Sequence, residues 1–462
     1  MRTVLGVFVV AFLFAGLTTF GQTAIDAPEF QARRKAALEK VPDGIVLLHT
    51  SWGLKHWDES GFHQDPSFYY FTGLANAHGA ILALDGTKKE SWLFLMPRIP
   101  IFPDLQGFDS AFFDPGPQTE KELGIDHVVA WDQFATFIES HRKDNPKVVL
   151  YTDQGGQTGD MSGDRQFGTP PGLGPVQNPN LTWTNMLRQK WSDIEVKDAF
   201  AILDQVRSVK SAAELARMRQ AAVVTAEGFW AGVHAIAPGK TQRQVEGAVL
   251  DACLQAGSDG PSLWPWVRSG PYALENVLFE PFVDYRNMDR KMQAGEVVRL
   301  DLGCDFQMYK GDFGRTIPVS GHFDEGQRET MELLNGAYLA GVATMRPGAS
   351  SMDVFKATLA YIDQHQSELK TAMAKEAAAD ALKRKGYALH GLGVDMAEGA
   401  PKSFQAGNVL CYEPQLTSGN QSFFVEDTFL ITTAGHEVIN PALPYSPVDI
   451  EKAMGQSPPQ SK

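Results

Sequence analysis

The chain has 462 residues, of which 43% are hydrophobic, and its formal net charge at pH 7 is −14. This length suffices for two or three domains with ordinary hydrophobic cores. The negative charge argues against binding to nucleic acid or to an anionic membrane surface, because neither would attract this protein electrostatically. A small molecule or a peptide is therefore the expected substrate.

The amino-terminal segment has the pattern of an export signal. Arg2 precedes an apolar run from Val4 to Leu17, which is too short to span a bilayer but suits the core of a signal peptide. We expect residues 1–21 to be removed and the mature protein to be secreted or periplasmic, without a stable membrane span. The alternative is an amino-terminal anchor that is not cleaved.

The following stretch alternates between helical and extended patterns. A helix is expected over residues 29–41, and strands are expected over residues 44–49, 80–84, 92–96, 127–131 and 147–152. Strands that alternate with helices predict an α/β domain, which we place at residues 27–195. The glycine- and proline-rich residues 155–180 are expected to form a loop before the domain boundary.

Two helix-start motifs open the second part of the chain. Ser211 with Glu214, and Thr241 with Gln244, have the spacing of capping boxes. The second box lies in APGKTQRQV, and the segment RPGASSMDV at residues 346–354 has the same arrangement. An internal duplication would explain this similarity, and a chance likeness between two helix-turn-helix segments is the alternative.

Three cysteines, Cys253, Cys304 and Cys411, lie in separate apolar segments. Their odd number and wide spacing do not indicate a disulfide framework or a zinc-thiolate site. We therefore expect three buried free thiols, which behave as small hydrophobic side chains.

Residues 295–321 have the pattern of a β-hairpin that carries acidic side chains. If this hairpin closes about its midpoint, Asp301 and Asp312 lie opposite each other. Opposed carboxylates, with Cβ atoms about 5 Å apart, destabilise a sheet unless a positive charge lies between them. A bound cation would supply that charge. The alternative is that Asp312 lies in a solvated turn and never meets Asp301.

A second hairpin is expected to bring two further acids together. Residues 418–421, with the sequence SGNQ, form its turn, so that Glu413 and Glu426 face each other. Their neighbours are apolar, and unpaired acids are rarely buried. His390, in a glycine-rich bend, adds one imidazole to the four carboxylates. Such a set suits a pair of divalent ions such as Mn²⁺, with Zn²⁺ or Co²⁺ as alternatives.

These segments resemble the Xaa-Pro aminopeptidase and prolidase branch of the metallopeptidases with the creatinase, or pita-bread, fold. The similar motifs are DLGCDFQMYKGDFGRTIPVSG, HGLGVDMAEGAP, YEPQL and VEDTFLIT, together with residues 62–73 and 206–222 upstream. The resemblance implies a mixed α/β (α+β) fold. Its parts are a creatinase-like amino-terminal domain over residues 27–195, a pita-bread catalytic domain with a pseudo-twofold repeat over residues 200–445, and a tail over residues 446–462.

The resemblance also implies roles for single residues. It makes Asp301, Asp312, His390, Glu413 and Glu426 the ligands of two metal ions, with Asp312 and Glu426 shared between the ions. Glu413 would also take and relay a proton from the attacking water. The implied protein is a hydrolase that cleaves the amide bond before proline in short peptides, working as a homo-oligomer, either a dimer or a tetramer.

The chain departs from the family at positions around the metals. Asp284, Gly386 and Ala397 occupy the places of three histidines, and Phe424 replaces an arginine. Losing a positioned acid or base commonly costs about 10²–10⁴-fold in rate. The alternatives are therefore altered, non-peptidase chemistry on this fold or a metal-binding or assembly protein whose catalysis has lapsed.

Two assignments stay open at this level. Asp284 would bind a substrate amine or act as a base, or it is a surface acid beside Arg286. A competing alignment makes His390 a substrate-site histidine and leaves Val394 at the ligand position. We favour His390 as the ligand, because the second alignment leaves VDMAE without a counterpart in the motif.

Overall fold

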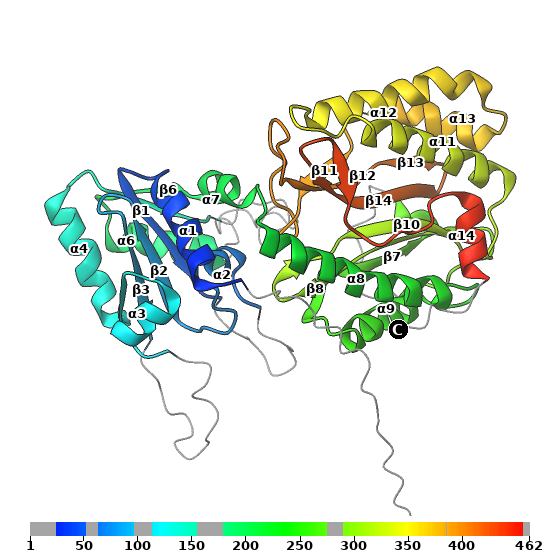
Figure 1. Ribbon diagram of the computed structural model, residues 1–462. Coiled ribbons are helices and arrows are strands. Elements are labelled where there is room, and N and C mark those ends of the chain that lie inside the picture. Colours follow the sequence, from blue (N-terminus) through cyan, green and yellow to red (C-terminus); the bar gives the residue numbers. More distant parts are fainter. Residues whose placement is uncertain are drawn as a thin grey trace, which may run out of the picture.

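The computed structural model describes residues 25–51, 63–96, 113–154, 179–274, 290–384 and 386–455. These residues form two domains, with the amino-terminal domain on the left of Figure 1 and the carboxyl-terminal domain on the right. The expected export signal and Asp284 lie outside the described residues. Within the described ranges, no helix combines the length and the apolar character that crossing a membrane requires.

The amino-terminal domain is a mixed six-stranded sheet with helices on both faces, in the order β4-β3-β2-β1-β5-β6. Its strands are β1 (Gly44–His49), β2 (Ala80–Asp85), β3 (Glu90–Leu95), β4 (His127–Ala130), β5 (Val149–Thr152) and β6 (Glu195–Asp198). Its helices are α1 (Ala27–Leu38), α2 (Pro66–Thr72), α3 (Pro117–Leu123), α4 (Phe134–Asp144) and α6 (Pro179–Lys190), with the 3-10 turn η2 (Trp131–Gln133). The edge strand β6 pairs in parallel with β5 at the carboxyl-terminal end of this domain.

Local sequence signals explain how α2 forms. Asp65 caps the helix by accepting a hydrogen bond from the Phe68 N–H, and Pro66 occupies the first turn, where no backbone donor is needed. Gly73 ends the helix with a φ of 76°, a left-handed conformation that glycine adopts without a steric penalty. Together, α1 and α2 pack on one face of the sheet, and α4 and α6 pack on the other.

The carboxyl-terminal domain is built on a second sheet, with the order β11-β12-β14-β10-β8-β7. The strands of this path are β7 (Gly260–Ser269), β8 (Val297–Phe306), β10 (Phe313–Pro318), β11 (Ala388–Gly391), β12 (Val409–Glu413) and β14 (Gln421–Ile431). The short strands β9 (Tyr309–Lys310), β13 (Gln415–Ser418) and β15 (His436–Val438) pair beside this path. The 3-10 turn η3 (Gly270–Ala273) follows β7.

Two groups of helices cover this sheet (Figure 1). The helices are α7 (Phe200–Arg207), α8 (Ala212–Ala235), α9 (Gln242–Gln255), α11 (Glu325–Val342), α12 (Ser351–His365), α13 (Ala372–Ala381) and α14 (Pro447–Met454), with the 3-10 turn η5 (Gln366–Glu368). Helices α8 and α9 pack against β7 and β8, whereas α11 and α13 pack against β13 and β14.

The two helix groups repeat one local design. Gly239 precedes α9 with a φ of 82°, and Gly348 precedes α12 with a φ of 88°. Thr241 and Ser350 then cap these helices, each in a complete capping box. The turn, the cap and the order of the helices correspond, which supports the internal duplication that the sequence pattern indicated.

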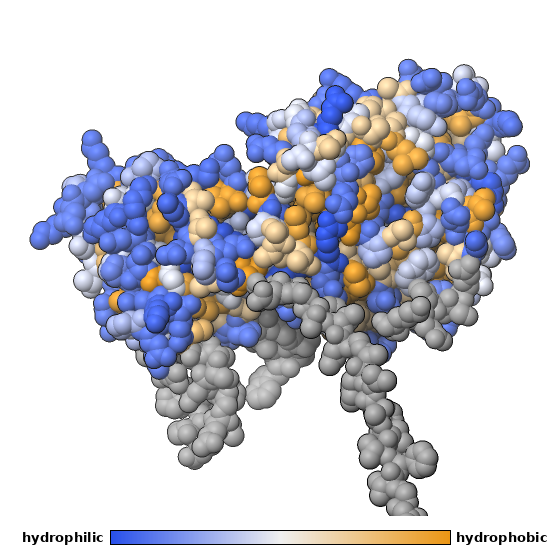
Figure 2. Space-filling view, in the orientation of Figure 1, coloured by the Kyte–Doolittle hydropathy of each residue, from blue (hydrophilic) through white to orange (hydrophobic). Residues whose placement is uncertain are grey.

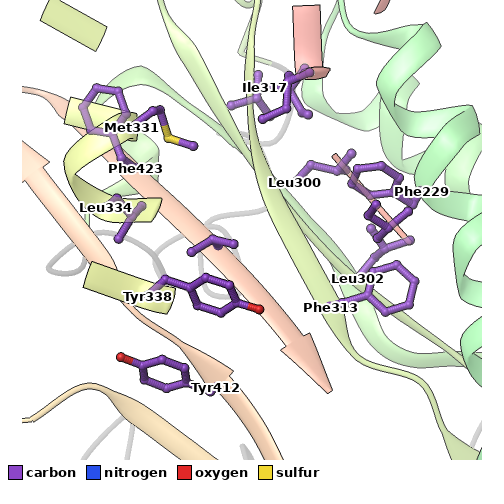
Figure 3. Packing of buried hydrophobic residues seen from close by; sticks show 14 of the residues in the cluster. Phe229, Leu300, Leu302, Phe313, Ile317, Met331, Leu334, Tyr338, Tyr412 and Phe423 are labelled. Carbon is purple, nitrogen blue, oxygen red and sulfur yellow. The ribbon is translucent and has the colours of Figure 1, made fainter. Parts of the chain in front are cut away.

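Alternation along the strands separates the core from the opposite face of the sheet. Leu300 and Leu302 of β8 belong to the same buried cluster as Phe229 of α8, and Tyr412 of β12 stacks on Tyr338 of α11 with ring centroids 5.9 Å apart. Figure 3 shows both groups. Since successive side chains of a strand point to opposite faces, Asp301 and the other acids lie on the face that these helices do not cover.

The amino-terminal domain contacts the hairpin that carries the first two acids. Arg33 of α1 donates to the hydroxyl of Tyr309 on β9 at 3.3 Å, and this hydroxyl donates to Glu214 of α8 at 3.2 Å. Tyr309 is buried in a cluster that also contains Phe30 and Tyr69 of the amino-terminal domain. The tip of the hairpin is therefore held between the two domains.

Hydrophilic residues cover most of the face seen in Figure 2, and hydrophobic residues appear among them in small groups. Large exposed hydrophobic side chains include those of Val223, Leu339 and Val448. Scattered exposed hydrophobic residues are normal on soluble domains. This face by itself therefore does not identify a partner.

The structure corrects the expectation for the cysteines. Cys253 of α9 and Cys304 of β8 form a disulfide, so only Cys411 is a buried free thiol among the described residues. The expectation of three free thiols was wrong because spacing along the chain does not reveal that α9 packs close to β8. Within residues 446–455, the described part of the expected tail, α14 buries Ile450 in the core of the domain.

We expect the Cys253→Ala/Cys304→Ala double variant to be less stable than the unaltered protein. The disulfide joins residues separated by 51 positions, and closing such a loop lowers the entropy of the unfolded chain. The expected loss is about 4 kcal/mol in the free energy of unfolding, measured by guanidinium denaturation. As a control, thiol titration of the denatured, unreduced protein should find one reactive thiol. Three reactive thiols would contradict the disulfide.

Candidate metal centre

The hairpin formed by β8 and β10 differs in register from the sequence-based expectation. Gln307 and Met308 form its turn, with φ values of 48° and 73°, as in the two-residue turns that suit tight hairpins. Asp301 therefore pairs with Gly314 and not with Asp312. The expected direct opposition of the two acids was wrong. The shift is an even number of residues, so Asp312 stays on the same face, diagonal to Asp301.

Gly314 lets the neighbouring strands approach closely at this point. A Cβ atom here would lie 2.3 Å from the ring of Phe424 and 2.8 Å from the carbonyl oxygen of Leu300. Any larger residue would push β10 away from β8 and β14. Gly314 also pairs with Glu426 of β14, so the strand places one glycine between two acids.

The second hairpin has the expected register. Tyr412 pairs with Asp427, and Gln415 pairs with Phe424, so the positions on both sides of Glu413 follow the prediction. The turn at Gly419 has a φ of 54°, which agrees with the local turn chemistry. Local sequence signals were sufficient here because the turn residues themselves fix the register.

The structure brings the five predicted side chains together. Their possible ligand atoms form two overlapping groups, in each of which all atoms lie within 4.8 Å of one another. One group consists of Asp301, Glu413 and Glu426, and the other consists of Asp312, His390, Cys411 and Glu426. His390 Nε2 lies 3.5 Å from Asp312 Oδ2 and 3.9 Å from Glu413 Oε1.

Two features of this cluster fit divalent cations. Glu426 Oε2 is buried and has no hydrogen-bond partner in the protein, which is costly for a carboxylate oxygen. His390 Nδ1 lies 2.9 Å from the Gly391 carbonyl oxygen, so this nitrogen carries the proton and donates it. In the neutral imidazole Nε2 is then the nitrogen without a proton, and it faces the acids, as in histidines that bind metal. The five residues therefore suit metal ions, and their role as ligands stays a prediction.

Burial and the nearby negative charges raise the pKa values of several acids in the cluster. Burial, followed by the charges of Asp301 and Glu413, raises the pKa of Asp312 well above its usual range. Burial, followed by the charge of Asp312, does the same to the pKa of Glu426. Burial also raises the pKa of Glu413 and that of the Cys411 thiol. Without an added positive charge, the cluster therefore holds protons.

Arg299 is a site residue that sequence reasoning missed. Its Nη2 donates to Asp301 Oδ2 at 2.9 Å and to Glu413 Oε2 at 3.0 Å. The guanidinium carbon lies 3.7 Å from the centroid of the Phe424 ring, within cation–π range. A guanidinium thus reaches the acids from β8, although β14 carries phenylalanine where the resemblance led us to expect arginine. Spacing in the sequence could have revealed Arg299, because Arg299 and Asp301 are two residues apart and therefore share one face of the strand.

The structure also bears on the competing alignment and on the missing histidines. Val394 is buried in an apolar cluster, whereas His390 lies beside the acids, so the geometry favours His390 at the ligand position. Gly386 is exposed and Ala397 is half-buried, and neither offers an acid or a base. The contribution of Asp284 lies outside the described residues.

Comparison with known proteins gives two family matches. The model for metallopeptidase family M24 matches residues 216–433, and the model for the aminopeptidase P amino-terminal domain matches residues 30–151. The Xaa-Pro aminopeptidase of Haemophilus influenzae is 24% identical over 456 residues, covering 92% of this chain and 97% of that protein. The Xaa-Pro aminopeptidase of Escherichia coli is 25% identical over 464 residues, covering 93% and 98%.

Solved structures share the fold. A putative aminopeptidase P from Bacillus anthracis superposes with a TM-score of 0.74 at 20% identity, covering 93% of this chain and 99% of that one. Aminopeptidase P from Escherichia coli with the inhibitor Pro-Leu gives a TM-score of 0.70 at 24% identity, covering 93% and 98%. The expected fold class, a pita-bread domain preceded by a creatinase-like α/β domain, is confirmed.

The stabilising effect of metal should depend on pH. In the metal-free protein the pKa values of Asp312 and Glu426 are raised, so both carboxyl groups bind protons more tightly in the folded state. This contributes to stability in full when the pH is below the ordinary carboxyl pKa of about 4. That contribution is lost as the pH rises through the raised values of the folded state. Metal displaces the protons, so we expect its gain in melting temperature to grow between about pH 5 and pH 8. Calorimetry of chelator-treated protein, with and without Mn²⁺, measures this gain. A gain that does not change with pH would refute the protonated cluster.

Replacing Arg299 should destabilise the metal-free protein strongly. The Arg299→Met variant leaves Asp301 and Glu413 without the cation that they share, and breaking a buried ion pair costs about 3–5 kcal/mol. Chemical denaturation measures this loss, which should shrink when divalent metal is added. The matched control is Arg142→Met, which removes solvent-exposed ion pairs to Glu139 and Asp193 and should lower the free energy of unfolding far less than Arg299→Met does. Similar losses in both variants would refute a compensating role for Arg299.

Proposed function

Because the chain belongs to metallopeptidase family M24 and carries an aminopeptidase P amino-terminal domain, we propose that it cleaves the amide bond before proline in short peptides, as a dinuclear-metal hydrolase. The observation that carries this proposal is the convergence of the five predicted ligands in one buried cluster. The similar curated proteins from Haemophilus influenzae and Escherichia coli are Xaa-Pro aminopeptidases, which supports the same substrate class.

The donor set fits two divalent ions, and we propose Mn²⁺, with Zn²⁺ or Co²⁺ as alternatives. Asp312 and Glu426 would be shared, Asp301 would complete one position, and His390 with Glu413 would complete the other. Divalent ions bound there supply Lewis acidity, which polarises a carbonyl and activates water. The unpartnered Glu426 Oε2 supports this assignment, because a shared metal would satisfy it.

Glu413 is the residue that we propose for proton transfer. Its Oε2 accepts a hydrogen bond from Arg299 at 3.0 Å, while its Oε1 faces His390 Nε2 at 3.9 Å. Burial raises the pKa of this carboxyl group, which brings it closer to the range in which a base both accepts and releases a proton. Arg299 would hold Glu413 and Asp301 in orientation while the proton moves.

A second candidate function is favoured by the positions that lack histidine. Gly386 and Ala397 offer no group that could bind substrate by a charged hydrogen bond or protonate a leaving amine. A metal-binding or assembly protein, or a hydrolase with altered chemistry on a non-peptide amide, would need neither histidine. Metal binding without turnover of proline peptides distinguishes these candidates from the first.

We also propose that the protein is exported and forms a homo-oligomer. The buried disulfide between Cys253 and Cys304 supports an oxidising compartment, because cytosolic proteins rarely keep structural disulfides. The proposed oligomer, a dimer or a tetramer, depends on the family resemblance.

Xaa-Pro dipeptides and tripeptides should be hydrolysed in the presence of Mn²⁺, and a chelator should abolish this activity. The Glu413→Gln variant should lower kcat by about 10²–10⁴-fold, because it removes the proton acceptor. Release of the amino-terminal residue measures turnover, and elemental analysis of both proteins separates a loss of chemistry from a loss of metal.

A protein that binds metal fully but turns over none of these peptides would refute the peptidase assignment. In that case a Gly386→His/Ala397→His variant tests the second candidate. Among the described residues, and apart from its neighbours in the chain, no atom lies within 4 Å of the place that a Cβ at Gly386 would occupy, so a side chain has room there.

A further inference from the structure

Cys411 lies inside the candidate metal centre and not in an apolar core alone. It is directly opposite His390 in the pairing of β11 and β12, and it precedes Glu413 by two residues on the same face of β12. Its sulfur lies within 4.8 Å of possible ligand atoms of Asp312, His390 and Glu426. The side chain is fully buried.

The surroundings of this thiol leave its sulfur available to a cation. The Thr428 hydroxyl donates its proton to the Asp312 carbonyl oxygen at 2.5 Å. Its oxygen lies 3.4 Å from the Cys411 sulfur, and the thiol also hydrogen-bonds to the Asp312 side chain. The buried, unpartnered Glu426 Oε2 belongs to the same group of atoms and independently indicates a missing positive ligand.

Resting on the proposed metal site, we propose that Cys411 is a further metal ligand on the His390 side of the centre. When metal binds, the S–H bond breaks, its proton passes to solvent, and the sulfur donates its electron pair to the ion. The metal position on the His390 side would then have nitrogen, oxygen and sulfur donors. Sulfur ligands favour Zn²⁺ over Mn²⁺, so this side of the centre selects Zn²⁺ or Co²⁺. The other side, with oxygen donors, accepts harder ions.

X-ray absorption spectroscopy of the zinc-loaded full-length protein tests this ligand directly. We expect a sulfur scatterer at about 2.3 Å from zinc, together with lighter nitrogen and oxygen atoms. The Cys411→Ser variant, which keeps a hydrogen-bonding group of similar size, should lose the sulfur signal. The Cys253→Ala/Cys304→Ala variant is the matched control and should keep it, because those sulfurs form the disulfide.

Competition between Zn²⁺ and Mn²⁺ gives a second measurement. The preference for Zn²⁺, determined by elemental analysis after dialysis against both ions, should fall by about 10–100-fold in Cys411→Ser. Circular dichroism checks that the variant is folded. If it does not fold, the spectrum of the unaltered protein alone decides.

The outcomes separate this inference from the proposed function. Zinc bound through nitrogen and oxygen only would overturn the role of Cys411 and leave the hydrolase proposal standing. A protein that binds neither ion would overturn both.

Discussion

Repulsion among buried like charges is the constraint on which the carboxyl-terminal domain depends. Asp301, Asp312, Glu413 and Glu426 converge in one buried cluster, where the low dielectric strengthens their repulsion. Arg299 compensates for part of it by donating to Asp301 and Glu413. Protonation compensates further in the metal-free protein, and divalent ions would do so when bound. The electrostatic strain of the folded chain and its predicted affinity for metal therefore have one cause.

The sheet meets this constraint by separating its two faces. Leucines of β8 and tyrosines of β12 and α11 form the core, while the acids lie on the opposite face of the same strands. The hairpin between β8 and β10 is held at its tip, because Tyr309 contacts Arg33 of one domain and Glu214 of the other. The amino-terminal domain thus contributes to the position of the acids without supplying any of the five predicted ligands.

The centre combines features that support hydrolysis with features that alter it. The predicted ligands have the types and order of the family motifs, and Glu413 lies between Arg299, which donates to its Oε2, and His390, which faces its Oε1. Gly386 and Ala397 lack the imidazoles that the resemblance led us to expect, so in the proposed hydrolase these two positions supply no acid or base. The Cys411 sulfur lies beside His390 in the same cluster, and a sulfur ligand at this position would influence which metal ion binds there.

Sequence alone determined the features that depend on local chemistry. The capping boxes at Ser211 and Thr241, the turn at Gly419 and the register around Glu413 follow from residues close together in the chain. The sequence motifs also pointed to the four acids of the cluster and to His390 as candidate metal ligands. Tertiary structure decided what remote segments do to one another. The turn at Gln307 and Met308 lacks glycine or asparagine, so only the packed sheet fixed the register of Asp301. The disulfide, the stacking of Arg299 on Phe424 and the place of Cys411 in the cluster likewise arise between strands and helices whose contacts no local pattern encodes.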